Sequence, residues 1–298
     1  MGEKSKIEWT ETTWNPIRGC SSVSEGCRYC YAAAMASRFS GPGQPYEGLT
    51  KDGRWTGTVR MVPEHLGAPL RWKRPRRVFV NSMSDVFHEA LAFEDVAEIF
   101  RVMAAAPQHS FQVLTKRAER MAEWFRWMEE RKPGVWPLPN VWLGISVENQ
   151  AAADLRVPFL LQSPAAVRWL SCEPLLGPVD LSGFGALDWV VVGGESGLHA
   201  RPMHPDWVRG VRDYCAQAKV PFLFKQYGEW APAMGDLYWR PLDGGPQFPV
   251  WASGTTTHAF GDGYGAVRIG KAKAGRLLDG CVHDSYPVEA AGLPLFGA

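Results

Sequence analysis

From about residue 77 onward, short apolar segments alternate with segments in which apolar residues recur at helical spacing. The apolar segments predict strands over residues 78–80, 111–114, 141–146, 167–170, 189–192 and 221–225. The periodic segments predict helices over residues 93–103, 118–128, 149–161 and 205–218. Repeated strand–helix units form parallel sheets with right-handed crossovers, so this alternation places the chain in the α/β class.

Six such strands, joined by a further one near residues 14–18, predict an open or incomplete (β/α) barrel of six to seven parallel strands. A doubly wound sheet is the alternative, because no single strand distinguishes the two. The barrel would occupy residues 1–227. Residues 228–298 form the carboxyl-terminal extension. Its segment 230–258 is rich in Gly, Pro, Trp and Thr without a helical period, which predicts an irregular excursion, a short β-hairpin or a lid.

Polar residues follow the predicted strands, at the edge where (β/α) barrels carry their functional groups. Ser82, Ser84 and Asp85 follow one strand, and Lys116 and Arg117 follow the next. The later strand ends carry Ser146, Glu148, Cys172, Glu173, Gly193, Gly194, Glu195, Lys225 and Gln226. Together they predict a ligand-binding edge of the sheet.

Three cysteines lie close together near the start of the chain: Cys20, Cys27 and Cys30. Three thiolates can ligate three irons of a [4Fe–4S] cluster and leave the fourth iron without a protein ligand. An open iron is what a radical S-adenosylmethionine (SAM) enzyme needs, because the methionine end of SAM chelates it. The gap between Cys20 and Cys27 is longer than is usual for this chemistry, whereas the spacing of Cys27 and Cys30 fits it. We therefore predict a [4Fe–4S] cluster and SAM as cofactors.

Zinc is the main alternative, but structural zinc takes four ligands, and the next Cys or His after Cys30 is His65. Disulfides are less expected, because the six cysteines lie in a 298-residue chain that does not begin with a secretory signal. Cys215 falls on an apolar helical stripe and is predicted to be core. Cys172 ends an apolar strand, where it could face a substrate or be buried.

Composition excludes some classes of function. With 46% hydrophobic residues, the chain can build one large core or two modest ones. The formal net charge of +1 shows no global basicity of the kind found in many nucleic-acid binders. No apolar run reaches the length of a membrane span. We expect a cytoplasmic protein with no membrane association.

Local basic runs remain candidates for nucleic-acid binding. One surrounds Trp72, which could stack on a base, and a second lies in a Gly-rich segment near the carboxyl terminus. The candidate phosphate contacts are Arg71, Lys73, Arg74, Arg76, Arg77, Lys271 and Lys273. For the first run, cations that complement a helix carboxyl terminus are an equally good interpretation.

Taken together, these motifs resemble a phage-associated, radical-SAM-like family of three-cysteine proteins, some of which are encoded beside a "three-Cys-motif partner" protein. The matching segments include Trp14-Asn15-Pro16, the cysteine loop, residues 69–73, residues 80–88 and residues 114–117. Gly193-Gly194-Glu195-Ser196, Lys225-Gln226 and residues 270–280 extend the match over nearly the whole chain. The resemblance implies a radical-SAM barrel with cluster ligands at Cys20, Cys27 and Cys30.

The positions of the strand-end residues suggest roles for them in such an enzyme. In radical SAM enzymes a Gly-Gly-Glu motif usually follows the second strand, a position held here by residues 82–85, so Gly193-Gly194-Glu195 could serve substrate or the SAM carboxylate instead. The expected cofactor-binding residues are Ser82, Ser84, Asp85, Glu148, Gly193, Gly194, Glu195 and Lys225. The expected catalytic residues are Lys116, Glu173 and Cys172, the last as a hydrogen donor.

A phage setting points to modified DNA bases as substrates. One expected reaction is an isomerisation that converts a nitrogen-linked glycine on the thymine methyl carbon to a carbon-linked one. The expected partners are DNA or a nucleotide, a flavodoxin-like electron donor and a three-Cys-motif partner protein, in the host cytoplasm if the chain is phage-encoded. Base repair and RNA modification are alternative radical reactions. A metal-stabilised module that binds DNA or protein without catalysis is the alternative from a different class.

Overall fold

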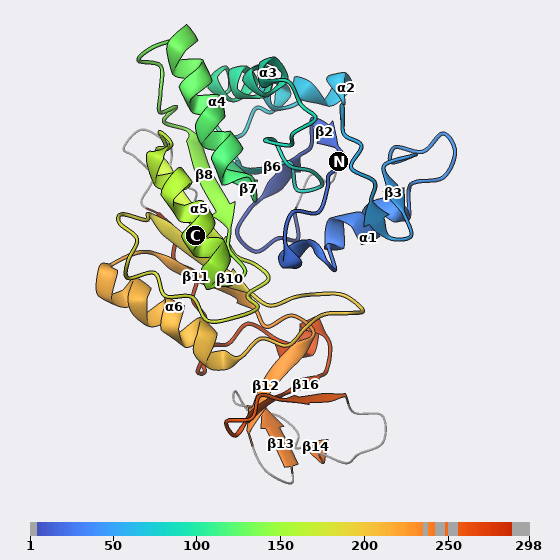
Figure 1. The fold of residues 1–298 in the computed structure, drawn as a ribbon, viewed down its shortest axis with the longest axis vertical. Coiled ribbons are helices and arrows are strands. Elements are labelled where there is room, and N and C mark those ends of the chain that lie inside the picture. Colours follow the sequence, from blue (N-terminus) through green and yellow to red (C-terminus); the bar gives the residue numbers. More distant parts are fainter. Residues whose placement is uncertain (1–4, 235–237, 242–247, 250–255, 288–298) are drawn as a thin grey trace. The chain divides into compact units, whose positions relative to one another are not determined.

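The computed structural model describes residues 5–234, 238–241, 248–249 and 256–287 (Figure 1). Its main sheet has seven parallel strands in the order β1-β6-β7-β8-β9-β10-β11 and curls into a half-barrel. These strands are β1 Thr12–Trp14, β6 Arg77–Val80, β7 Ser110–Thr115, β8 Val141–Ser146, β9 Val167–Cys172, β10 Trp189–Gly193 and β11 Phe222–Gln226. The predicted incomplete (β/α) barrel is thus confirmed.

The helices connect these strands in the predicted order. The longer ones are α3 Phe93–Ala104, α4 Ala118–Arg131, α5 Gln150–Gln162 and α6 Pro205–Ala218. The shorter ones are α1 Tyr31–Ser37, α2 Pro63–Leu66, α7 Lys271–Ala274 and the 3₁₀ turns η1 Glu25–Cys27 and η2 Pro69–Arg71. No helix among the described residues is long and apolar enough to cross a membrane.

The strand predicted near residues 14–18 is divided in two. β1 pairs in parallel with β6, whereas β2 (Ile17–Arg18) pairs antiparallel with β5 (Arg60–Met61). Pro16 lies between them, and a proline cannot donate a backbone hydrogen bond to a strand. A second small hairpin, β3 (Thr50–Lys51) and β4 (Arg54–Trp55), follows α1.

The chain divides into two compact units. Unit 1 comprises Met1–Ser146, Leu155–Trp169 and Pro287–Ala298; unit 2 comprises Val147–Asp154 and Leu170–Tyr286. In unit 1 the register aligns Trp14 with Val80, and Val80 with Val113. The carboxyl ends of neighbouring strands therefore share one edge, so the residues that follow them are brought together.

Aromatic side chains fill the core of unit 1. Trp9 packs on Phe79 and Trp169, with ring centroids 4.7 and 5.2 Å apart. Gly144 of β8 lies directly against the Trp169 ring. A Cβ atom at this position would lie only 2.3 Å from the ring, so a side chain would not fit there. On the helical side, Phe100 of α3 contacts Trp124 of α4 with centroids 4.3 Å apart, and Figure 1 shows these two helices side by side.

Unit 2 carries a five-stranded antiparallel sheet in the order β14-β13-β12-β16-β15. Its strands are β12 Trp230–Met234, β13 Tyr238–Pro241, β14 Phe248–Pro249, β15 Thr257–Ala259 and β16 Tyr264–Arg268. The sequence predicts an irregular extension, a short β-hairpin or a lid here, and the structure has antiparallel strand pairs in this region. Its strands are two to five residues long and interrupted by Gly and Pro, so none shows a readable alternation.

Candidate functional site

The cysteine loop begins at Gly19, directly after β2. Gly19 has a φ of +92°, and a Cβ atom there would lie 2.1 Å from the carbonyl oxygen of Thr58. A parallel bridge joins Gly19 to Ser84, and the Cys20 carbonyl accepts a hydrogen bond from Gly57 at 3.2 Å. These contacts fix the start of the loop beside the carboxyl end of β6.

The three predicted cluster ligands lie along this loop, and each is a free, half-buried thiol. Cys27 ends the η1 turn, and Cys30 precedes the first turn of α1. Cys27 and Cys30 line one cavity of about 290 Å³ together with Arg28, Arg54 and Trp55. Unit 1 contains no other cysteine.

Burial raises the pKa of the Cys20 thiol to about 12, Asp85 adds to this effect, and Arg117 opposes it. Among the described residues, no three Cys, His, Asp or Glu side chains are already gathered around one point as ligands of a single metal ion. Three reduced thiols on one short loop, partly open to solvent and without a fourth thiol in the unit, nevertheless match the donor set of a three-thiolate [4Fe–4S] site.

Asp85 organises the strand ends next to the loop. Its Oδ1 accepts hydrogen bonds from the Phe87 amide at 2.9 Å and the Thr115 hydroxyl at 2.8 Å. Its Oδ2 accepts from the Lys116 amide at 3.2 Å and from Arg117 Nη1 at 3.0 Å. A carboxylate has about four acceptor positions, so all of those of Asp85 are used within the chain.

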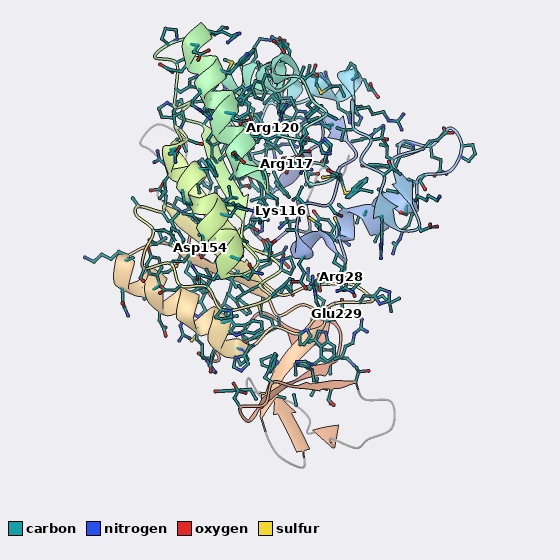
Figure 2. All side chains as sticks on the ribbon, in the orientation of Figure 1. Arg28, Lys116, Arg117, Arg120, Asp154 and Glu229 are labelled. Atoms are coloured by element: carbon teal, nitrogen blue, oxygen red, sulfur yellow. The ribbon has the colours of Figure 1, made fainter. Side chains whose placement is uncertain are left out.

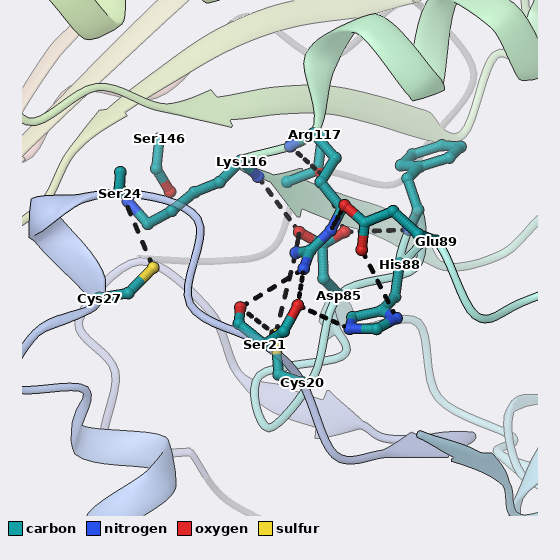
Figure 3. A network of polar contacts seen from close by, with 12 residues as sticks. Cys20, Ser21, Ser24, Cys27, Asp85, His88, Glu89, Lys116, Arg117 and Ser146 are labelled. Atoms are coloured by element: carbon teal, nitrogen blue, oxygen red, sulfur yellow. Dashed lines mark hydrogen bonds and ion pairs between the residues drawn. The ribbon is translucent and has the colours of Figure 1, made fainter. Parts of the chain in front are cut away.

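Arg117 connects Asp85 to the cysteine loop (Figure 3). Nη1 also contacts the Cys20 sulfur at 3.9 Å, and Nη2 donates to the Ser21 hydroxyl at 2.7 Å. Nε donates to Glu89 at 2.7 Å. Burial alone would lower the pKa of Arg117, but the carboxylates of Asp85 and Glu89 outweigh it and raise that pKa, so this buried guanidinium stays charged.

His88 completes this network from the same strand end. The Ala90 amide donates to His88 Nδ1 at 3.1 Å, so the ring proton is on Nε2, which lies 2.9 Å from the Ser21 hydroxyl. Burial and the nearby Arg117 lower the pKa of His88, which keeps the ring neutral at neutral pH. The Ser21 oxygen therefore accepts hydrogen bonds from both His88 and Arg117.

Asp85, Lys116 and Arg117 belong to the polar strand ends that the sequence predicts to bind a ligand, whereas Ser21, His88 and Glu89 are not predicted to have a role. Arg117 and His88 do stand in the segments quoted for the family resemblance, at 114–117 and 80–88. Both are polar residues close to the carboxyl end of a predicted strand, and this position is the one feature of the sequence that indicates a functional role for them. Sequence spacing could not show that Arg117 reaches back almost a hundred residues to Cys20.

The hydroxyl groups of Ser82 and Ser84 are also engaged. Ser82 donates to the Asn15 side chain at 3.2 Å, and Ser84 donates to the Ile17 carbonyl at 3.1 Å. Both bonds hold the segment that leads into the cysteine loop. By contrast, Asn81 is 2% exposed, and neither its side-chain oxygen nor its nitrogen has a hydrogen-bond partner among the described residues. A buried amide without partners is costly, which favours a polar ligand or water at this position.

Unit 2 gathers a second group of predicted residues. Lys225 Nζ forms an ion pair with Glu173 at 2.7 Å, with 19% and 14% of the two side chains exposed. Ser171 also donates to Glu173, at 3.1 Å. A Cβ atom at Gly193 would lie 2.8 Å from the Glu173 carboxylate, so the glycine lets this side chain lie against the backbone. Cys172, at the end of β9, is fully buried.

The Gly-Gly-Glu motif has a structural explanation in unit 2. A Cβ atom at Gly194 would lie 2.0 Å from the Tyr227 carbonyl oxygen, so the two backbones approach closely there. The Glu195 carboxylate is 5% exposed and is held by Arg201 through Nη2 at 2.7 Å and Nε at 2.8 Å. Glu148 is likewise buried, and its carbonyl oxygen accepts a hydrogen bond from Leu176 at 2.7 Å.

The basic run lies away from the cysteine loop within unit 1. The basic run precedes β6, whereas residues 81–85 follow β6. The two segments therefore lie at opposite ends of this strand. Arg71, Lys73 and Arg74 are exposed. Trp72 is flanked by Arg76 at 5.1 Å and by the His109 ring at 5.6 Å. Arg77 is in β6, with its amide bound to Glu11, and Lys271 and Lys273 of unit 2 are exposed on α7.

One family model matches residues 4–287, and its description is "Protein of unknown function (DUF5131)". No curated protein and no solved structure gives a significant match to the chain.

Proposed function

The chain belongs to the DUF5131 family, and from the geometry of unit 1 we propose that it is a radical SAM enzyme. The three cysteines Cys20, Cys27 and Cys30 would hold a [4Fe–4S] cluster, and SAM would bind the iron that has no cysteine ligand. When bound and reduced, this pair supplies a 5′-deoxyadenosyl radical that abstracts hydrogen from a substrate.

One observation carries the proposal: a loop with three free, half-buried thiols is fixed at the carboxyl edge of a (β/α) half-barrel, in a unit with no fourth cysteine. Functional groups of (β/α) barrels are placed at this edge. A closed zinc site would need another ligand, which no cysteine of the unit can supply. The reduced state of the thiols is the form that ligates iron.

The neighbouring residues divide into supporting and ligand-binding groups. Asp85, Ser82 and Ser84 already bond within the chain, so we assign them to hold the loop and the strand ends in place. The buried, unpartnered amide of Asn81 is the better candidate for direct contact with SAM, because a polar ligand would satisfy both its donor and its acceptor. Lys116, which follows the neighbouring strand β7 and donates its amide to Asp85, is the candidate to meet a carboxylate of the ligand.

We propose a nucleic-acid base as the substrate class. The exposed cations Arg71, Lys73 and Arg74 support this choice, because they present positive charge to solvent on an otherwise nearly neutral chain. The specific reaction proposed is the conversion of a nitrogen-linked glycine on thymine to a carbon-linked one, an isomerisation that conserves atoms. A base in duplex DNA would have to be flipped out of the helix to react.

In unit 2 the Glu173–Lys225 pair and Cys172 are proposed to act on the substrate. Cys172 would donate a hydrogen atom at the end of the reaction. If Cys172→Ala leaves both turnover and product unchanged, this role is eliminated and the rest of the proposal stands.

The test of the proposed function is SAM cleavage. The protein is reconstituted anaerobically with iron and sulfide, reduced, mixed with SAM and assayed for 5′-deoxyadenosine. We expect product from the wild type and from Cys281→Ser, whose thiol is exposed and lies outside the loop, and none from Cys27→Ala. A loaded cluster that never cleaves SAM, even with candidate DNA present, would instead favour the non-catalytic binding module.

A further inference from the structure

We infer that Arg117 tunes the reduction potential of the cluster through the sulfur of Cys20, with Asp85 acting in the opposite direction. This inference rests on the proposed function. Neither residue would touch the reacting atoms, so both are positioning residues. The inference concerns their charge and hydrogen bonds rather than their contribution to folding.

The guanidinium group of Arg117 has a partner in every direction. Nε donates to Glu89 at 2.7 Å, and Nη1 faces Asp85 at 3.0 Å and the Cys20 sulfur at 3.9 Å. Nη2 donates to the Ser21 hydroxyl at 2.7 Å and the Ser21 carbonyl at 3.4 Å. Arginine has five N–H groups, and this arrangement gives each of them one acceptor. The orientation of Arg117 is therefore fixed.

This fixed orientation places one N–H of a buried cation toward a cluster ligand. The Arg117 side chain is 4% exposed, so water screens its charge weakly. As an iron ligand Cys20 would be a thiolate, and a donor at the position of Arg117 Nη1 would then form a charge-assisted hydrogen bond to its sulfur. Hydrogen bonds to cluster sulfurs and nearby charge are among the factors that set the potential of an iron–sulfur cluster.

The expected direction follows from charge. Reduction adds an electron, and a positive group near the ligand sulfur stabilises the reduced state, so Arg117 raises the potential. Asp85 is 8% exposed, and its Oδ2 lies 3.0 Å from the same Arg117 Nη1 that contacts the Cys20 sulfur at 3.9 Å, so its negative charge is also close to this ligand. The same charge disfavours added electron density, so Asp85 lowers the potential. Removing the two charges should therefore shift the potential in opposite directions.

Four proteins test this inference: wild type, Arg117→Gln, Asp85→Asn and Arg120→Gln. Arg120 is the matched control, because it lies one turn along α4 (Figure 2) and donates to the Leu91 carbonyl at 2.6 Å rather than to the loop. Each protein is reconstituted with iron and titrated anaerobically against redox dyes, with electron paramagnetic resonance of the reduced cluster as the readout. Iron content is measured on the same samples, and circular dichroism checks folding.

We expect Arg117→Gln to lower the reduction potential of the cluster. At a fixed applied potential the ratio of reduced to oxidised cluster should fall at least tenfold, which corresponds to about 59 mV for a one-electron couple. Asp85→Asn should shift it toward reduced, and Arg120→Gln should match the wild type. Arg117→Lys keeps the positive charge but lacks the planar guanidinium group that bonds several acceptors at once. It should lower the reduction potential by less than Arg117→Gln does. This variant replaces Arg117→Gln in the test if Arg117→Gln does not retain iron.

The inference is overturned if the reduction potential shifts in the same direction in the Arg117 and Asp85 variants, or if it does not shift in either. Such a result would indicate that the network only holds the loop in place. Absence of any cluster in the wild type would instead refute the proposed function. The two failures are therefore distinguishable in one set of samples.

Discussion

Gly19 shows how closely the cysteine loop is built against its neighbours. Its positive φ is unfavourable for other residues, and a side chain would overlap the Thr58 carbonyl. The loop start therefore depends on the absence of a side chain one residue before the first predicted ligand.

We expect Gly19→Ala to lower the free energy of unfolding by about 2 kcal/mol or more, because backbone strain and a steric overlap both oppose the native conformation. Urea unfolding followed by tryptophan fluorescence measures this change. Gly210→Ala is the matched control, since Gly210 lies in α6 with open space around it, and it should be neutral or stabilising by up to about 1 kcal/mol. Equal effects of the two substitutions would contradict the strain argument.

At the residue scale, the sequence identifies the three cysteines as candidate cluster ligands from their residue type and proximity along the chain. It does not predict the partners that hold them. Arg117, His88 and Ser21 meet only because neighbouring parallel strands end at one edge, which requires the register of β6 and β7. The role suggested for Ser82 and Ser84 changes for the same reason, since their hydroxyls turn to Asn15 and Ile17.

At the scale of elements, the segment after α7 pairs with β11, the last strand in the order of the main sheet. The amide of Phe224 in β11 donates to His283, and the Ser285 amide donates back to Phe222. Unpaired strand edges promote association between chains, so this segment protects β11. Asp279 anchors it to α6 through ion pairs with Arg209 at 2.6 Å and Arg212 at 2.5 Å.

Hydrogen bonds from Arg209, together with Arg212, lower the pKa of Asp279 to about 2, from an ordinary value of 3.8. Because the folded-state pKa is below the unfolded one, these ion pairs stabilise the fold above about pH 4 and are lost as the pH falls toward 2. The carboxylate is 36% exposed, so solvent screening limits the effect to about 1 kcal/mol.

Asp279→Asn should therefore be less stable than wild type at pH 7, and the difference should shrink as the pH falls from about 4 to about 2.5. Urea unfolding at both ends of this range measures it. Asp52→Asn is the control, because Asp52 shares the left-handed backbone conformation and has no ion pair in the described part of the chain. A difference that stays constant with pH would argue against the ion pairs.

The basic run before β6 is a second element with a testable role. If Arg71, Lys73 and Arg74 bind phosphates, replacing all three with Gln should reduce the slope of log affinity against log salt by about 0.9 for each phosphate that is no longer neutralised. Fluorescence anisotropy with labelled DNA at several salt concentrations measures the slope. Gln at the exposed cations Arg126, Arg131 and Lys132 at the end of α4 controls for net charge. An equal decrease of the slope in both triple variants would show that the run makes no special contribution to DNA binding.

At the scale of the whole molecule, the strand–helix alternation predicts the sheet well because most of its strands contain a short apolar segment, such as residues 141–143 or 189–192, between helical patterns. β8 and α6 fall where the pattern places them, and the others differ by a few residues at their ends. The antiparallel sheet of unit 2 could not be predicted in the same way. Its strands are short, and Pro232 and several glycines interrupt the alternation on which strand prediction depends.

We propose that Cys20, Cys27 and Cys30 together hold one [4Fe–4S] cluster, on which the proposed radical chemistry depends. The most direct test is the metal and sulfide content of the anaerobically reconstituted protein, with electron paramagnetic resonance of the reduced sample, for the wild type and single alanine variants. We predict about four irons and four sulfides per chain, absent from each loop variant and retained in Cys281→Ala. One zinc per chain in place of iron, or a full cluster that survives all three loop substitutions, would show that these cysteines do not hold a [4Fe–4S] cluster.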